Sequence, residues 1–84
     1  MTHAAVGQFT ELYERLPLKV QKLADNNFSV IKEYPNHPLL RLLKVDGLWS
    51  MRIGSTYRAL GAENGETIVW FWIGKYKHYT AFFQ

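Results

Sequence analysis

The sequence contains no cysteine, and its 84 residues include only three prolines and six glycines. Without cysteine the chain can form no disulfide and no thiolate metal site, so apolar packing must hold the fold, which is compatible with a reducing compartment. No apolar run approaches the roughly 18 residues that span a bilayer, and residues 1–8 lack the basic and apolar regions of a signal peptide. We therefore expect a cytoplasmic protein that does not contact membranes.

Several common kinds of site are also missing from the sequence. His3, His37 and His78 are far apart and lack the paired spacing of zinc ligands. No glycine-rich loop of the kind that cradles phosphates is present, and neither Ser50 nor Ser55 has an adjacent histidine to activate it as a nucleophile. We therefore expect no metal and no cofactor.

Length and composition predict one globular domain over residues 1–84. A chain of this size is too short for two independent domains. Small domains bury a modest share of their surface and need a dense core. A content of 48% hydrophobic and 15% aromatic residues can supply that core, so we do not expect disorder.

The net charge of +3 is unevenly distributed. Basic and acidic residues balance up to Leu40, and the surplus follows in Arg41, Lys44, Arg52, Arg58, Lys75 and Lys77. The pattern indicates that an anionic partner would meet the second half of the chain. The alternative is a solvated basic face that favours solubility.

Hydrophobic periodicity predicts two helices in the first half. Apolar residues at helical spacing favour an amphipathic helix over residues 5–15, and Pro17 then starts a second helix. The apolar stripe of this second helix has one polar intrusion, Asn27. It should end near Glu33, because Pro35 disfavours the helical conformation of Tyr34.

From Arg41 onward the pattern changes to that of strands. Alternation predicts strands over residues 49–53 and 57–63, and the unbroken apolar run in residues 67–74 is typical of a strand covered on both faces. A short strand is expected over residues 42–45, while residues 76–83 could be a helical turn or a loose end. The predicted fold is α+β, with two N-terminal helices packed on one face of a three- or four-stranded antiparallel sheet.

Arg52 and Arg58 are the most informative pair of charges. If the turn between them comprises Gly54 to Thr56, the two side chains stand opposite one another on one face of a hairpin. Like charges in that position destabilise a sheet unless an anion such as a phosphate lies between them. The alternative is two exposed arginines whose stems cover apolar surface.

Several segments together resemble the RelE/ParE toxin superfamily of bacterial toxin–antitoxin pairs. They are Leu16 to Asp25, Leu48 to Gly54, Tyr57 to Leu60, and Trp72 to Gly74 followed by Tyr79. The resemblance covers nearly the whole chain from Phe9 and implies a RelE-like fold. Members of that family usually begin with a strand, which we do not expect here because the first helix starts almost at once.

The resemblance implies the toxin of a type II toxin–antitoxin system, an endoribonuclease that cuts mRNA on the ribosome without a metal ion. The residues that it suggests for catalysis are Arg52, Arg58, His78 and Tyr79, with Arg41, Lys44, Lys75 and Lys77 binding RNA. Close relatives often have histidine two residues after the glycine of the Ile-Gly pair, where this chain has Tyr76. Two alternatives remain: a non-enzymatic toxin of the ParE type that binds DNA gyrase, and a catalytically inactive interaction module.

The expected partners are a cognate antitoxin, the ribosome and mRNA. A sheet that lacks its first strand would also leave one edge with unpaired N–H and C=O groups. Such an edge recruits strands, either from the antitoxin or from a second copy in a homodimer.

Overall fold

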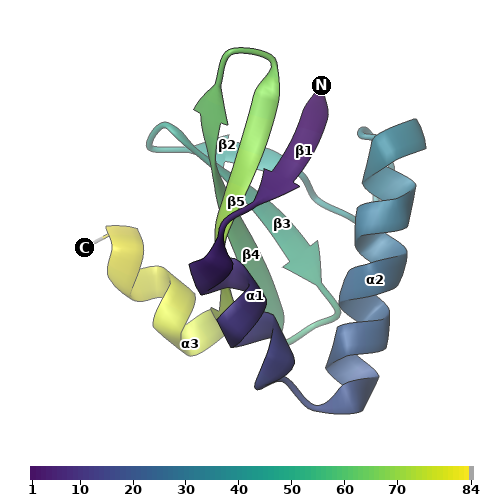
Figure 1. Ribbon diagram of the computed structural model, residues 1–84, viewed down its shortest axis with the longest axis vertical. Helices are drawn as coiled ribbons and strands as arrows, with labels where there is room; N and C mark the ends of the chain where they lie inside the picture. The colour runs from purple at the N-terminus through teal and green to yellow at the C-terminus, as the bar shows by residue number, and fades with distance from the viewer. Residues whose placement is uncertain (84) are drawn as a thin grey trace.

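The computed structural model describes residues 1–83, which form five strands and three α-helices (Figure 1). Their order is β1 (Thr2–Ala5), α1 (Gly7–Glu14), α2 (Leu18–Glu33), β2 (Leu43–Val45), β3 (Leu48–Ile53), β4 (Tyr57–Asn64), β5 (Thr67–Lys75) and α3 (Tyr76–Tyr79), followed by a 3-10 turn (Thr80–Phe83). The tail beyond β5 is therefore helical. None of these helices has the length and apolar character needed to cross a bilayer.

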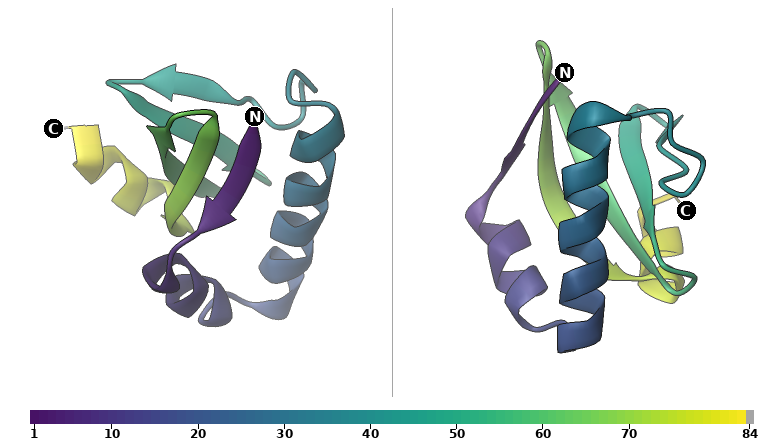
Figure 2. Two further views of the ribbon diagram at one scale, coloured as in Figure 1. Left: turned by 45° about the horizontal axis from the view of Figure 1, so that its top comes forward. Right: turned by 90° about the vertical axis from the view of Figure 1, so that its right-hand side faces the viewer.

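The five strands form one mixed sheet in the order β1-β5-β4-β3-β2. β1 runs parallel to β5, and the other neighbouring strands are antiparallel. Helices α1 and α2 lie on one side of the sheet, and α3 with the 3-10 turn lies on the other (Figure 2). The predicted α+β arrangement, with two N-terminal helices on one sheet face, is confirmed.

The expectation that the chain lacks a first strand is wrong. Thr2–Ala5 forms β1, which pairs with β5 in the register Thr2 to Thr67 and Ala5 to Trp70. The sheet consequently has five strands instead of three or four and is mixed instead of antiparallel. The β5 edge is filled by the chain itself, so the expectation of a homodimer through that edge loses its basis.

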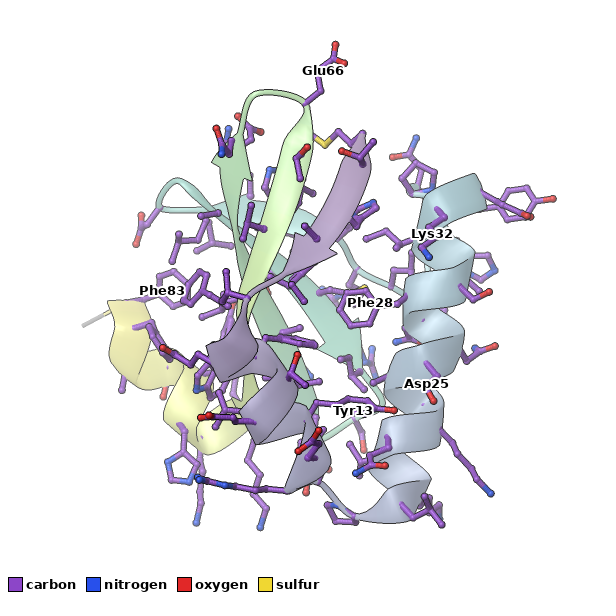
Figure 3. All side chains as sticks on the ribbon, viewed as in Figure 1. Tyr13, Asp25, Phe28, Lys32, Glu66 and Phe83 are labelled. Carbon is purple, nitrogen blue, oxygen red and sulfur yellow. The ribbon has the colours of Figure 1, made fainter. Side chains whose placement is uncertain are left out.

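Polar contacts fix the junction between α1 and α2. The Tyr13 hydroxyl donates a 2.6 Å hydrogen bond to Asp25, and Figure 3 shows these two side chains pointing toward one another. The side-chain amide of Gln21 donates to the carbonyls of Tyr13, Glu14 and Leu16 at 3.1–3.3 Å. Because the last carbonyls of a helix lack intrahelical donors, Gln21 stabilises the end of α1.

The core lies between the helices and the sheet. Met51, Ile53 and Ala59 are fully buried on the sheet side. Phe28 of α2 makes edge-to-face contacts with Phe9 of α1 and Trp70 of β5, with ring centroids 5.6 and 5.2 Å apart. Aromatic pairs of this geometry add to the stabilisation from buried area, so this cluster joins both helices to the sheet.

An irregularity explains why β5 shows no apolar alternation. The register with β4 shifts between Leu60, which pairs with Trp72, and Gly61, which pairs with Trp70, leaving Phe71 unpaired. Such a bulge changes which face the following residues occupy. Trp70 is therefore buried under the helices, whereas Trp72 contacts Phe82 of the C-terminal segment at 5.1 Å. β5 is covered on both faces, as predicted.

Candidate anion-binding site

The β3–β4 hairpin places two arginines opposite one another. Arg52 pairs with Arg58 in the register of the two strands, and residues Gly54 to Thr56 form the connection, as the sequence predicts. Gly54 has a φ of 61°, a left-handed conformation that suits glycine. Two cations therefore share one face of the sheet, on the side away from α1 and α2.

These arginines line a pocket of about 300 Å³. Its wall consists of Arg41, Leu43, Ser50, Arg52, Arg58, Tyr76 and Tyr79. In the described part of the chain no aspartate or glutamate lines it. The pocket therefore combines three positive charges with two aromatic rings and provides no counter-ion of its own, which is the environment that an anion such as a phosphate group prefers.

Arg41 enters the pocket from the connection between α2 and β2. The preceding residue, Leu40, is fully buried, and its carbonyl accepts a 2.8 Å hydrogen bond from the backbone N–H of Arg52. Arg41 itself has a φ of 44°, a left-handed conformation that costs a non-glycine residue roughly 1–2 kcal/mol. Backbone strain of this kind concentrates at functional sites, where surrounding contacts maintain it.

Arg52 is held by contacts on both sides of the sheet. Its side-chain Nε donates a 3.0 Å hydrogen bond to the carbonyl of Gly54. Its own carbonyl accepts a 2.7 Å hydrogen bond from the side-chain amide of Asn27, which lies in α2 and is only 3% exposed. The polar intrusion in the apolar stripe of α2 thus anchors the strand that carries Arg52.

Arg58 is positioned by the start of α3. Its guanidinium carbon lies 4.8 Å from the ring centroid of Tyr76, a cation–π distance, and its Nη1 donates to the Tyr57 carbonyl at 2.8 Å. The backbone N–H of Tyr76 donates a 2.7 Å hydrogen bond to the carbonyl of Thr56. The hairpin turn that carries Arg58 therefore also fixes Tyr76.

Tyr76 and Tyr79 form an aromatic wall. They lie one helical turn apart in α3, and their rings are stacked with centroids 5.5 Å apart. Tyr79 also contacts Phe83, with centroids 5.1 Å apart. The wall gives the pocket two phenol groups, and its contacts with Arg58 and Phe83 hold both rings in place.

The electrostatics of Arg58 reflect this surplus of positive charge. Desolvation lowers the pKa of Arg58, the neighbouring Arg52 lowers it further, and Arg41 contributes in the same direction. Tyr76 and Tyr79 partly oppose the change in pKa. An arginine remains charged at physiological pH regardless, so the lowered pKa means that the pocket holds a cation at a cost that a bound anion would relieve.

The structure brings together some of the sequence-predicted site residues. Arg41, Arg52, Arg58 and Tyr79 all line the pocket. His78, Lys75 and Lys77 instead line a separate groove at the end of the sheet. His78, for which the sequence predicts a catalytic role, therefore does not line the pocket.

Lys44 lies apart from both sites. Its ammonium group is 3.3 Å from a carboxylate oxygen of Glu63 and 5.7 Å from the ring centroid of Trp49. The indole N–H of Trp49 also donates to Glu63 at 2.9 Å, and this hydrogen bond is the main reason that the pKa of Glu63 is lowered. Lys44 is therefore engaged in a surface cluster at the β2 end of the sheet.

Three polar residues that line or support the pocket are not among the sequence-predicted site residues. Ser50 lines the pocket because it is two residues before Arg52 on the same strand face, a spacing that the predicted alternation already contained. The sequence distinguishes Tyr76 only by its difference from the histidine that close relatives often have there. Asn27 stands out only as a polar residue in an apolar stripe, and its partner lies 25 residues away in the chain, so no local pattern identifies that partner.

No protein-family model and no curated protein matches the sequence. Solved structures do. A chain of the RelB–RelE antitoxin–toxin complex from Methanococcus jannaschii is 18% identical with a TM-score of 0.74, covering 96% of this chain and 99% of that one. The RelBE2 toxin–antitoxin complex from Mycobacterium tuberculosis matches at 22% identity and a TM-score of 0.66, over 88% and 95% of the two chains.

The isolated RelE toxin from E. coli matches at 13% identity and a TM-score of 0.65, covering 99% of this chain and 98% of that one. Each match extends over most of both chains. The protein therefore shares the fold of these RelE-type toxin structures, which is the fold that the sequence resemblance implied.

Proposed function

We propose that the protein is the toxin of a type II toxin–antitoxin system and that it cleaves mRNA on the ribosome without a metal ion, so that translation stops. The observation that carries the proposal is the convergence of Arg41, Arg52 and Arg58 with two tyrosines in one pocket that contains no acidic group among residues 1–83. The shared fold with RelE-type toxins supports the toxin role, and a cognate antitoxin is the partner that controls it.

The chemistry requires three contributions. A base takes the proton of a 2′-hydroxyl, whose oxygen then attacks the adjacent phosphorus. Cations stabilise the negative charge that develops on the phosphoryl oxygens. As the bond from phosphorus to the 5′-oxygen breaks, an acid supplies a proton to that oxygen, which leaves a 2′,3′-cyclic phosphate and a 5′-hydroxyl end.

The pocket contains groups suited to these roles. We assign charge stabilisation to Arg58 and Arg52, because a planar guanidinium matches the spacing of phosphate oxygens and stays protonated. We assign proton transfer to Tyr79, with Tyr76 beside it, because their phenol groups line the pocket together with the arginines. His78 lies outside the pocket and has no part in this assignment.

The test is an in vitro translation reaction to which the purified protein is added, with the message mapped by primer extension. We expect cleavage of ribosome-bound mRNA that leaves 2′,3′-cyclic phosphate and 5′-hydroxyl ends, the products of attack by the 2′-hydroxyl instead of a metal-bound water. The matched control is Arg58→Ala, which should leave the message intact. An intact message with wild-type protein, together with inhibited DNA supercoiling by gyrase, would instead support the alternative toxin type.

A further inference from the structure

A second basic surface lies at the end of the sheet, outside the pocket. It is a groove of about 520 Å³ between the α1–α2 junction and the start of α3. Arg15 lines it from the helix side, and Lys75, Lys77 and His78 line it from the other side. Figure 2 shows that α1 and α3 lie on opposite sides of the sheet, so the groove crosses the end of the sheet between them.

The charges in this groove are uncompensated. Among residues 1–83, no ion pair involves Arg15, Lys75 or Lys77, and no acidic side chain lines the groove. All three side chains are exposed, as is His78. Leu12, Leu16 and Tyr57 also line the groove and add apolar and aromatic side chains to these charges. Basic groups together with an aromatic side chain are typical of sites that follow a single-stranded nucleic acid.

Helix α3 separates the groove from the pocket and contributes to both. Tyr76 and Tyr79 line the pocket, whereas Lys77 and His78 line the groove. Lys75, the last residue of β5, lies in the groove directly before Tyr76. A polyanion that passes over this four-residue helix would therefore contact both sites.

We propose that the groove formed by Arg15, Lys75, Lys77 and His78 binds the phosphodiester backbone of RNA, as a continuation of the strand whose scissile phosphate occupies the pocket. The inference rests on the proposed function and extends it: the pocket performs the chemistry, and the groove holds the flanking nucleotides. His78 is thereby a binding residue instead of a proton donor. Lysines suit this role because an ammonium on a flexible stem contacts phosphates independently of sequence.

An RNA backbone fits the groove better than an acidic protein segment. The groove adjoins the proposed cleavage pocket through α3, so a strand held in the pocket can continue past Lys75 to His78 without leaving the basic surface. Each contact with a phosphate displaces counterions, so binding should weaken with rising salt in proportion to the number of basic groups engaged.

The experiment compares Lys75→Glu/Lys77→Glu with a control of equal charge change, Lys19→Glu/Lys22→Glu, whose lysines are exposed on α2 and line neither the pocket nor the groove. The probe is a fluorescent 2′-O-methyl RNA of about 20 nucleotides, which cannot form a 2′-oxyanion and so reports binding alone. We expect the groove variant to weaken binding at least tenfold more than the control, and the slope of log K against log salt to fall by about 1.4 for the two lost phosphate contacts.

The two proposals can fail separately. If wild-type protein cleaves ribosome-bound mRNA but the groove variant binds the probe like the control variant, the groove inference is overturned. If the wild-type protein cleaves nothing while the groove variant alone loses binding and salt dependence, the groove inference stands and the enzymatic proposal falls. Polyglutamate serves as a second probe that stands for an acidic protein segment. If the groove variant loses binding to polyglutamate but still binds RNA like the control variant, an acidic protein occupies the groove and the inference is overturned. Circular dichroism melting of both variants checks that they fold.

Discussion

The side-chain amide of Asn27 and the backbone carbonyl of Arg52 are joined by a 2.7 Å hydrogen bond across the interface between α2 and the sheet. Asn27 is the only buried polar residue of α2, within the part of the chain that the structure describes. Apolar burial has no preferred direction, whereas a hydrogen bond requires a specific geometry and so specifies one position of α2 on the sheet. The contact therefore holds the backbone of Arg52 from the face of the sheet opposite the pocket.

We expect Asn27→Leu to lower the free energy of unfolding by about 1–3 kcal/mol, because the buried carbonyl of Arg52 loses its donor. Urea denaturation measures the change. The control is Asn26→Leu at the neighbouring exposed position, which should alter stability by less than about 0.5 kcal/mol. Equal effects of the two substitutions would contradict the role of the hydrogen bond.

Arg58→Ala should abolish growth inhibition when the protein is expressed in bacteria, and Arg52→Ala should weaken it to a lesser degree. A cation that faces the transition-state phosphate contributes several kcal/mol to catalysis, whereas truncation of a partly exposed strand arginine has little effect on stability. Colony counts after induction provide the measurement, with immunoblots to confirm equal protein levels. Undiminished growth inhibition by both variants would show that the pocket is not the active site.

Inorganic phosphate should raise the melting temperature of the wild-type protein more than sodium chloride of equal ionic strength. The reason is that a bound anion relieves the repulsion among Arg41, Arg52 and Arg58 and stabilises only the folded state. Thermal melting at several phosphate concentrations measures the shift. Arg58→Gln removes one charge and should lose most of the phosphate-specific part; a shift that is the same in this variant would place phosphate elsewhere.

Stability should fall as the pH drops below about 6.5, the ordinary pKa of histidine, because of His3. Burial, the N-terminal charge and Lys32 of α2 lower the pKa of His3, whose Nδ1 accepts a 3.2 Å hydrogen bond from the Trp70 indole. The unfolded chain therefore takes up a proton before the folded one does. The contribution of neutral His3 to stability is complete above pH 6.5 and is lost as the pH falls toward the lower pKa of the folded state.

The measurement is the free energy of unfolding between pH 5 and pH 8 for the wild type and for His3→Gln. Glutamine retains an acceptor for Trp70 but does not titrate, so the difference between the two proteins isolates His3 from the carboxylates. We expect that difference to change with pH below 6.5 and to be constant above 7. Parallel curves over the whole range would contradict the assignment.

Gly61→Ala should destabilise the protein strongly. A Cβ atom at Gly61 would lie 2.5 Å from Cγ2 of Ile68 and 3.1 Å from the Trp70 ring, both of which are buried. Overpacking of this kind typically costs 1–3 kcal/mol. Gly7→Ala is the control, because a Cβ there would meet nothing within 4 Å. Chemical denaturation of both variants gives the comparison, and similar stabilities would mean that the bulge next to Gly61 can relax.

Local patterns predicted most of the fold. The 3,4 spacing located both N-terminal helices, and Pro17 and Pro35 set the limits of α2 within one residue. The three-residue turn fixed the register of Arg52 against Arg58, because in a hairpin the turn length determines which residues face one another. These features depend only on residues that are close in the sequence, so the local geometry of the chain determines them.

The features that could not be predicted depend on distant partners. Thr2–Ala5 has low strand propensity, and it becomes a strand because β5, more than sixty residues later, offers an unpaired edge. The separation of Tyr79 from His78 likewise depends on whether the tail is helical, since one residue turns a side chain by about 100° around a helix axis. The sequence identifies the candidate residues of this segment, but it does not determine which of them line the pocket and which line the groove.

The parallel pairing of β1 with β5 also affects when the chain can complete its fold during synthesis. β1 can pair only after β5, more than sixty residues later in the chain, has been synthesised, and Arg58 can contact Tyr76 only after that same strand. Contacts between such distant segments form slowly because a long loop must close first. A nascent chain on the ribosome therefore has neither a complete sheet nor a complete pocket until β5 and α3 have emerged, so the site acquires its full set of side chains late in folding.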